Sequence, residues 1–199
     1  ITGNEMWEGK HIEDFPGPQP ISIERKHLSQ LYENDYLVGP KNDGMRVALY
    51  VLKHNAKNYC LLMDRKMKMY RIKMKISKAM YEGTVIDCEL MEDTLVILDV
   101  IMIAGVNLKH HTFENRLDEV DTFINSVKES HYKISKKTFV SLNEIESILG
   151  DSDDKTDGLI FMPNKHAIQQ KTHKAMFKWK PQKQNTVDFY IKGKKQCCK

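Results

Sequence analysis

The stretch that decides the fold is TVIDCELMEDTLVILDVIMIA, residues 84–104. It contains two runs rich in Val, Ile and Leu, residues 84–90 and 94–103, separated by only three residues. This composition is typical of β-strands. A connection this short joins antiparallel neighbours, because a parallel pair needs a crossover of a dozen or more residues. The stretch therefore predicts two adjacent antiparallel strands.

The rest of the chain extends this pattern. Further strands are predicted at residues 36–40, 45–52, 58–65, 158–163 and 186–192, and helices at 22–34, 112–130 and 141–150. Ser22 is the predicted N-cap of the first helix, and Ser141 with Glu144 forms a capping-box pattern before a stop at Gly150. The Pro-rich lead-in, residues 1–21, is expected to be extended where its prolines lie. We therefore predict one α+β domain over residues 1–199, with mostly antiparallel sheets flanked by helices.

Composition indicates a globular protein, and the charge distribution leaves two interpretations open. The 199 residues are 41% hydrophobic and 29% charged, and no apolar run approaches the ~20 residues of a membrane helix. Residues 1–80 carry a net charge of +5, residues 81–160 carry −10 and residues 161–199 carry +9. If these regions meet in space, they form a cationic cleft that holds a few carboxylates and suits phosphate and metal. The alternative is solvated surface charge.

Lys41 stands beside an Asn-Asp-Gly sequence in YLVGPKNDGMRVALYVL, residues 36–52. Asp-Gly between apolar runs predicts a hairpin turn, because Gly accepts a positive φ without steric cost. Lys41 is then either a solvated charge at the mouth of the hairpin or a group that the turn positions.

Three more segments carry polar groups next to predicted strands. Asp87 and Glu89 in IDCEL are two residues apart and share a strand face. Asp157 precedes Gly158 and an apolar run, and Lys178 and Lys180 in FKWKP also share a face. Each segment also has a plain structural interpretation. Asp87 and Glu89 are then the solvent face of an edge strand, and Asp157 with Gly158 is a simple turn. Lys178 and Lys180 are then charges that protect an edge strand from aggregation.

Together these residues suit nucleophilic catalysis by lysine. A lysine must be neutral to attack, and its free pKa is about 10.4, so nearby cations or a metal would activate it. Lysines can also neutralise charge that develops on phosphate, and carboxylates can position a hard metal ion. The sequence has no Gly-rich loop ending in Gly-Lys-Ser/Thr. The reaction that these residues suit best is covalent attachment of a nucleotidyl group to Lys41.

The ordered set KNDGMR, IDCEL, ILDVIM, TDGLIF and FKWKP resembles the motifs of the lysine-dependent ligase and mRNA capping superfamily. The lead-in FPGPQPISIERKHLSQL and the "DG" at Asp157 resemble mRNA guanylyltransferases more than ligases. The resemblance implies a nucleotidyltransferase fold in which the basic tail, residues 190–199, stands where a C-terminal OB-fold domain would follow. That domain has no counterpart before Lys199, so we expect this chain to bind nucleotide but to guanylylate itself poorly.

The resemblance also implies a two-step reaction. Lys41 would attack the α-phosphate of GTP, release pyrophosphate and form a lysyl-GMP intermediate, and the GMP would pass to the 5′-diphosphate end of RNA to make the cap. The implied nucleotide-binding residues are Arg46, Arg65, Glu89, Lys178, Lys180 and Lys137, with Lys136 as the alternative to Lys137 for reading guanine. Glu89 and Asp157 would serve a divalent cation, Mg or Mn. Leu98 stands where many relatives have an aromatic residue that stacks on the base, Cys88 replaces a usual Gly, and Asp188 fits the pattern without an assigned role.

Several expectations about context follow from the same resemblance. The partners would be GTP, 5′-diphosphate RNA and further capping domains (triphosphatase and methyltransferase) of the same polypeptide, with no membrane. The chain looks like a domain of a multifunctional capping enzyme from a large DNA virus of the pox or African swine fever type. It would then act in the host cytoplasm or the virion, or in the nucleus if it is cellular. The rival hypotheses are an ATP-dependent DNA or RNA ligase adenylation domain and a non-catalytic RNA-binding relic.

Overall fold

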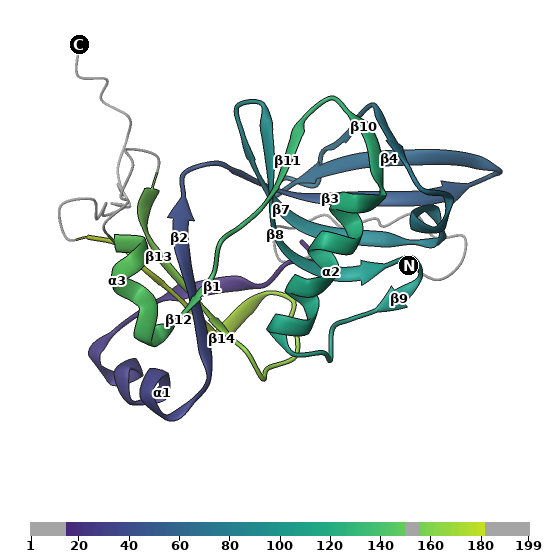
Figure 1. Cartoon of the computed structure of the whole chain (residues 1–199). Coiled ribbons are helices and arrows are strands. Elements are labelled where there is room, and N and C mark those ends of the chain that lie inside the picture. The colour runs from purple at the N-terminus through teal and green to yellow at the C-terminus, as the bar shows by residue number, and fades with distance from the viewer. Residues whose placement is uncertain (1–14, 150–155, 182–199) are drawn as a thin grey trace, which may run out of the picture.

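The computed structural model describes residues 15–149 and 156–181 and shows two main β-sheets that meet at an angle (Figure 1). The seven-stranded sheet has the order β11-β8-β7-β3-β4-β5, with β9 added beside β8. Its strands are β3 Met45–His54, β4 Lys57–Asp64, β5 Met69–Arg71, β7 Thr84–Met91, β8 Thr94–Ile103, β9 Val106–Asn107 and β11 Lys133–Lys136.

The five-stranded sheet has the order β1-β14-β13-β2-β12. Its strands are β1 Gln19–Ser22, β2 Tyr36–Asn42, β12 Val140–Ser141, β13 Thr156–Pro163 and β14 Thr172–Trp179. A separate pair joins β6 Met74–Ile76 to β10 Val127–Ser130. The helices are α1 Leu28–Glu33, α2 Phe113–Ser126 and α3 Ile145–Leu149, with 3-10 turns at Arg25–His27, Lys78–Glu82 and Leu142–Glu144.

The predicted antiparallel pair at residues 84–104 is confirmed. Strands β7 and β8 run antiparallel, with Leu90 opposite Leu95 across the short connection. Among the described residues only β1 with β14 and β11 with β8 pair in parallel. The α+β fold with mostly antiparallel sheets is therefore as predicted, and β7 is an interior strand between β8 and β3 rather than an edge.

The predicted hairpin at residues 36–52 is wrong. Strand β2 pairs with β12 and β13, whereas β3 pairs with β4 and β7, so the chain crosses from one sheet to the other at Asp43 and Gly44. Gly44 is needed for close approach rather than for a positive φ: a Cβ there would lie 2.8 Å from the carbonyl oxygen of Leu90. This crossing places Lys41, near the end of β2, at the junction of the two sheets.

The helix predictions hold in part. Ser22 ends β1 and caps nothing, because the first helical turn is capped by Glu24 in a capping box with His27. The helix predicted over 112–130 begins after its N-cap Thr112 and ends at Ser126, since the chain leaves to form β10. The capping box of Ser141 and Glu144 is present. The predicted stop at Gly150, the strand at 186–192 with Asp188 and the tail at 190–199 lie outside the described residues.

The main core lies between α2 and the large sheet (Figure 1). Phe113, Val120 and Phe123 of α2 are fully buried there. A buried ion pair strengthens the contact: Arg116 of α2 donates to both oxygens of Asp99 on β8, at 2.8 and 2.9 Å. No helix of the described residues is long and apolar enough to cross a membrane.

Candidate active site

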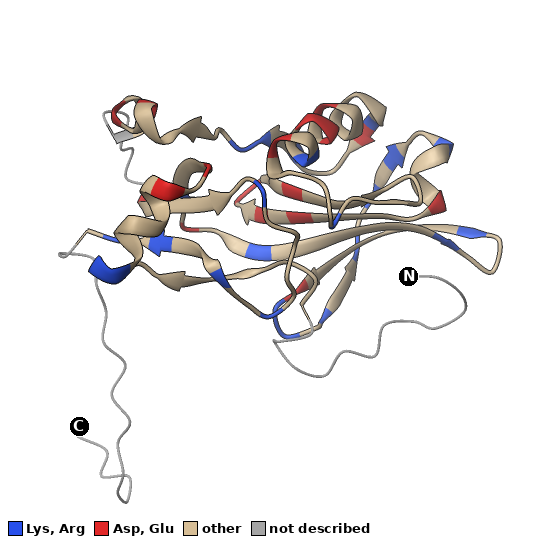
Figure 2. Ribbon diagram, turned by 90° about the horizontal axis from the view of Figure 1, so that it is seen from below, with Lys and Arg blue, Asp and Glu red and all other residues tan. Residues whose placement is uncertain are grey.

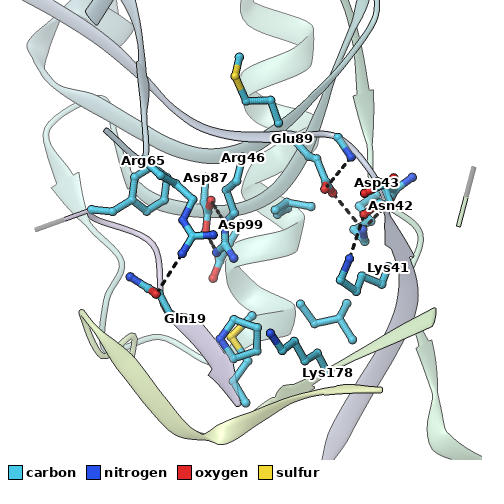
Figure 3. Close-up of a pocket in the computed structure, with 18 of the residues that line it drawn as sticks. Gln19, Lys41, Asn42, Asp43, Arg46, Arg65, Asp87, Glu89, Asp99 and Lys178 are labelled. Carbon is cyan, nitrogen blue, oxygen red and sulfur yellow. Dashed lines mark hydrogen bonds and ion pairs between the residues drawn. The ribbon is translucent and has the colours of Figure 1, made fainter. Parts of the chain in front are cut away.

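A pocket of about 540 Å³ opens between the two sheets (Figure 3). Both sheets contribute charged side chains to its lining: Lys41, Asp43, Arg46, Asp64, Arg65, Lys66, Asp87, Glu89, Asp99, Lys137 and Lys178. The cations and carboxylates come from the basic and acidic regions of the sequence alike. The predicted cleft, with cations around a few carboxylates, is therefore present.

Lys41 forms an ion pair with Asp157 beside this pocket. Its Nζ lies 2.5 Å from Oδ1 of Asp157, and the Nζ of Lys180 lies 2.5 Å from Oδ2 of the same carboxylate. All three side chains are less than a third exposed to solvent. Burial raises the pKa of Asp157, but the hydrogen bonds from Lys180 and Lys41 outweigh it, so this pKa lies below its usual value. The carboxylate stays ionised and holds both ammonium groups.

Gly158 explains how Asp157 reaches both lysines. The register of β13 against β2 shifts between Thr156 and Leu159, so Asp157 and Gly158 form a bulge rather than a simple turn. Gly158 has φ +139°, and a Cβ there would lie 1.9 Å from the carbonyl oxygen of Trp179. Only glycine permits this close packing of β13 against the end of β14.

Lys137 and Glu89 form the second charged group of the pocket. Lys137 is buried, and its Nζ lies 2.5 Å from Oδ1 of Asn42 and 3.7 Å from Oε2 of Glu89. Burial lowers the pKa of Lys137 to about 8, although Glu89 opposes this. Glu89 accepts the backbone N–H of Gly44 at 3.2 Å, and burial raises the pKa of its carboxyl group. Lys136 instead points away toward Asp121 of α2, at 2.7 Å, so Lys137 is the one of the two lysines in the pocket.

Arg46 and Arg65 stand on the opposite side of the pocket from Lys41 (Figure 3). The Arg46 guanidinium donates to both oxygens of Asp87 and, at 3.0 Å, to the carbonyl oxygen of Pro18. Arg65 donates to the side-chain oxygen of Gln19 at 3.3 Å. The predicted common face of Asp87 and Glu89 is confirmed, because both line the pocket.

The lysine pair of FKWKP divides its contacts. Lys178, on β14, lines the pocket and reaches into the same space as Lys41 (Figure 3). Lys180 is not one of the lining residues and contacts Asp157 instead. The structure therefore brings all the predicted site residues together around one cavity, with Asp157 and Lys180 at its margin.

Sequence reasoning missed several groups that shape the pocket. Asn42 stands in the Asn-Asp-Gly sequence of the predicted turn, and its side-chain oxygen accepts a hydrogen bond from Lys137. Asp99 lines the pocket while it pairs with Arg116. The apolar lining comes from Phe15, Pro20, Met45, Leu98, Phe139, Ile160, Met162 and Met176. Phe139 is thus an aromatic side chain in the same pocket as Leu98, and no motif in the sequence signalled it.

Comparison with known proteins places this arrangement in a family. Residues 4–182 match the family described as "mRNA capping enzyme, catalytic domain". The chain belongs to this family. Among curated relatives, the mRNA-capping enzyme subunit alpha of Schizosaccharomyces pombe is 26% identical, covering 92% of this chain and 55% of the relative. The mRNA-capping enzyme of Caenorhabditis elegans is also 26% identical, covering 92% of this chain and 34% of that protein.

Solved structures show the same fold in DNA ligases. The ligase domain of LigD from M. tuberculosis matches with a TM-score of 0.53 and 12% identity, covering 83% of this chain and 58% of that one. A Lig E DNA ligase structure matches with a TM-score of 0.51 and 12% identity over 83% and 68%. The capping-enzyme chain therefore has the nucleotidyltransferase fold of ligases, as predicted. It spans about half the length of the S. pombe relative and a third of the C. elegans one.

Proposed function

We propose that this chain is an mRNA guanylyltransferase domain in which Lys41 forms a covalent bond to GMP. The observation that carries the proposal is the position of Lys41, whose Nζ is held by Asp157 at the edge of a cation-lined pocket. The membership of the capping family supports guanylyl rather than adenylyl transfer. The ligase-like alternative shares the fold but not the family match.

The first step makes one bond and breaks one. The neutral Lys41 amine attacks the α-phosphorus of GTP, an N–P bond forms, the bond from that phosphorus to the bridging oxygen breaks, and pyrophosphate leaves. The ammonium must first lose a proton to solvent. Asp157 is a weak base because its pKa is lowered, so it orients Lys41 rather than accepting the proton. In the second step an oxygen of the RNA 5′-diphosphate attacks the same phosphorus and the N–P bond breaks.

The other pocket residues bind the nucleotide in this proposal. Lys178 reaches the space in front of Lys41, where it would neutralise charge on the α-phosphate. Arg46 and Arg65 would bind the ribose and the phosphates of the nucleotide. Lys137 is a buried donor that would read the O6 acceptor of guanine and disfavour the amino group of adenine.

A divalent cation, Mg or Mn, fits the site only together with the nucleotide. The described residues contain no group of three or more His, Cys, Asp or Glu that could hold an ion. Mg²⁺ commonly binds one or two carboxylates, with substrate phosphates and waters completing its shell. Glu89 and Asp157 would supply those carboxylates, and the cation would neutralise phosphate charge.

Mass spectrometry of the intact chain tests this proposal. After incubation with GTP and Mg²⁺ or Mn²⁺, we expect a covalent GMP adduct that peptide mapping places on Lys41. ATP in the same reaction should leave the mass unchanged. The assay counts adduct rather than turnover, so it detects a slow reaction.

Matched lysine variants supply the control. Lys41→Ala should abolish the adduct, whereas Lys174→Ala, at an exposed lysine that does not line the pocket, should retain it. An adduct with ATP only would favour the ligase alternative. An adduct that persists in Lys41→Ala would refute the nucleophile assignment, and no adduct in any condition would favour an RNA-binding relic.

The context of the activity is also part of the proposal. The chain would act on GTP and the 5′-diphosphate end of RNA, beside other capping domains of its polypeptide. A cytoplasmic or virion location for a viral protein, or a nuclear one for a cellular protein, goes with that role.

A further inference from the structure

One segment concentrates positive charge outside the pocket. Between Asp64 and Glu82 the sequence has no carboxylate and seven cations, namely Arg65, Lys66, Lys68, Arg71, Lys73, Lys75 and Lys78. The segment contains β5, the edge strand of the large sheet, and continues into β6. We call residues 65–78 the basic edge.

The backbone of the basic edge arranges its charges in a row. Arg71, Lys73 and Lys75 are exposed, while Ile72 and Met74 between them are half-buried. In extended chain, side chains on one side repeat every second residue, about 6.6 Å apart. This row can follow the phosphates of an extended polyanion.

The basic edge connects the nucleotide pocket with a second cavity. Arg65 and Lys66, at its start, line the nucleotide pocket. Arg71, Lys73 and Lys75 line a cavity of about 740 Å³ together with His131. Cations of the basic edge therefore extend from the rim of the nucleotide pocket to the second cavity.

Apolar and aromatic side chains lie on both sides of this strand: by alternation Met69 is on the side of Arg71, and Tyr70 is on the side of Lys68. Met69 and Tyr70 are each 41% exposed. The Nζ of Lys68 lies 5.1 Å from the centre of the Tyr70 ring, and the Arg71 guanidinium lies 5.3 Å from that of Tyr59. Exposed aromatic rings between cations are the surface on which single-stranded bases stack.

Lysines on an edge strand also prevent aggregation, but that role does not explain this distribution. Of the seven cations, Lys75 alone has an ion-pair partner among the described residues, Glu129. The acidic residues Glu114, Asp118, Glu119 and Asp121 instead gather on α2, which packs on β8 and β11 at the other end of the strand order (Figure 2). Apart from Lys75, whose partner Glu129 also lines the second cavity, the cations of the basic edge therefore have no ion-pair partner among the described residues and are left for an external anion.

We propose that the basic edge binds single-stranded RNA just downstream of the 5′ end that enters the pocket. The inference rests on the proposed function, because that function makes RNA the acceptor. Phosphates would contact Lys68, Arg71 and Lys73, and a base would stack on Tyr70. RNA is favoured over an acidic peptide because the cations alternate with an aromatic surface and begin at the nucleotide pocket.

Fluorescence anisotropy with the 199-residue chain tests this surface. The probe is a 5′-diphosphate RNA of about 15 nucleotides with a 3′ dye, without GTP or metal, so that no adduct forms. The triple variant Lys68→Gln/Arg71→Gln/Lys73→Gln should bind at least about 10-fold more weakly at 0.1 M salt. Its plot of log affinity against log salt should be less steep by about 2, because each phosphate contact on a single strand contributes about 0.7.

A second triple variant, Lys26→Gln/Lys165→Gln/Lys174→Gln, is the matched control. It makes the same change in net charge at exposed lysines elsewhere and should bind RNA like the wild type. Tyr70→Ala should weaken binding about 5-fold or more with an unchanged salt slope. Both triple variants should form the GMP adduct as the wild type does, so loss of the adduct in every protein would count against the proposed function alone.

Two results would overturn the proposal. One is equal RNA affinity of the two triple variants. The other is displacement of RNA from the wild type by polyglutamate as effectively as by unlabelled RNA of the same charge, which would assign the surface to acidic peptides.

Discussion

Substitution of Gly158 by alanine tests how the fold places Asp157 between its two lysines. The added Cβ would lie 1.9 Å from the carbonyl oxygen of Trp179, about 1.5 Å short of the 3.4 Å at which ordinary van der Waals contact begins. The obstacle is backbone, so β13 and the end of β14 must separate. Asp157 is next to Gly158 and Lys180 follows Trp179 in the sequence. The separation would therefore break the 2.5 Å contacts of Asp157 with Lys180 and with Lys41.

The magnitude has two parts. A non-glycine residue at φ +139° costs about 1–3 kcal/mol of backbone strain. Forcing extra volume into packed structure costs about another 1–3 kcal/mol. We therefore expect Gly158→Ala to lower the free energy of unfolding by about 2–6 kcal/mol.

Gly83→Ala is the matched control. Gly83 has φ +124°, but its added Cβ would make only ordinary contacts, with the flexible Met102 side chain at 3.4 Å and the Cα of Gly105 at 3.9 Å. It should lose about 1–3 kcal/mol from strain alone and keep the ability to form the GMP adduct. Urea denaturation measures stability, and mass spectrometry measures the adduct.

The comparison between the two glycine variants decides the point. If Gly158→Ala is no less stable than Gly83→Ala and still forms the adduct, the packing of Gly158 on Trp179 does not position Asp157.

Three further predictions concern charged groups. Asp157→Asn should lower the free energy of unfolding at pH 7 by about 1–3 kcal/mol in urea titrations. Because the folded pKa of Asp157 is lowered, the advantage of the wild type over this variant should vanish as the pH falls below about 4. A difference that does not depend on pH would contradict this prediction. Burial lowers the folded pKa of Lys137 to about 8, whereas a free lysine has a pKa of about 10.4. The unfolded chain therefore binds more protons between these two values, and the unfolding free energy of the wild type should rise by about 3 kcal/mol relative to Lys137→Met from about pH 8 to 10.4. Parallel curves for the two proteins would refute this. Arg116→Met should lower the free energy of unfolding by about 3–5 kcal/mol, because it leaves Asp99 buried and unpaired. The double variant Asp99→Leu/Arg116→Met should lower it less than Arg116→Met alone in the same assay. An equal or greater loss of stability in the double variant would argue against a buried unpaired charge.

The sequence by itself determined several of the strands and singled out polar residues that the fold brings to one pocket. Composition and a short connection identified the antiparallel pair at residues 84–104, since both are local properties of the chain. The spacing of Asp87 and Glu89 put them on one face for the same reason. The ordered motifs around Lys41, Asp157 and Lys178 named the family that the comparison then confirmed.

Only the tertiary structure decided how those segments pair and what the two glycine turns do. Residues 36–52 have the local chemistry of a hairpin, yet β2 and β3 belong to different sheets, because β2 pairs with β13, which lies more than 110 residues further along the chain (Asn42 is opposite Thr156). Gly44 and Gly158 are required by close approach to Leu90 and Trp179, contacts that no local pattern encodes. The choice of Lys137 over Lys136 likewise follows from burial, which is a property of the assembled fold.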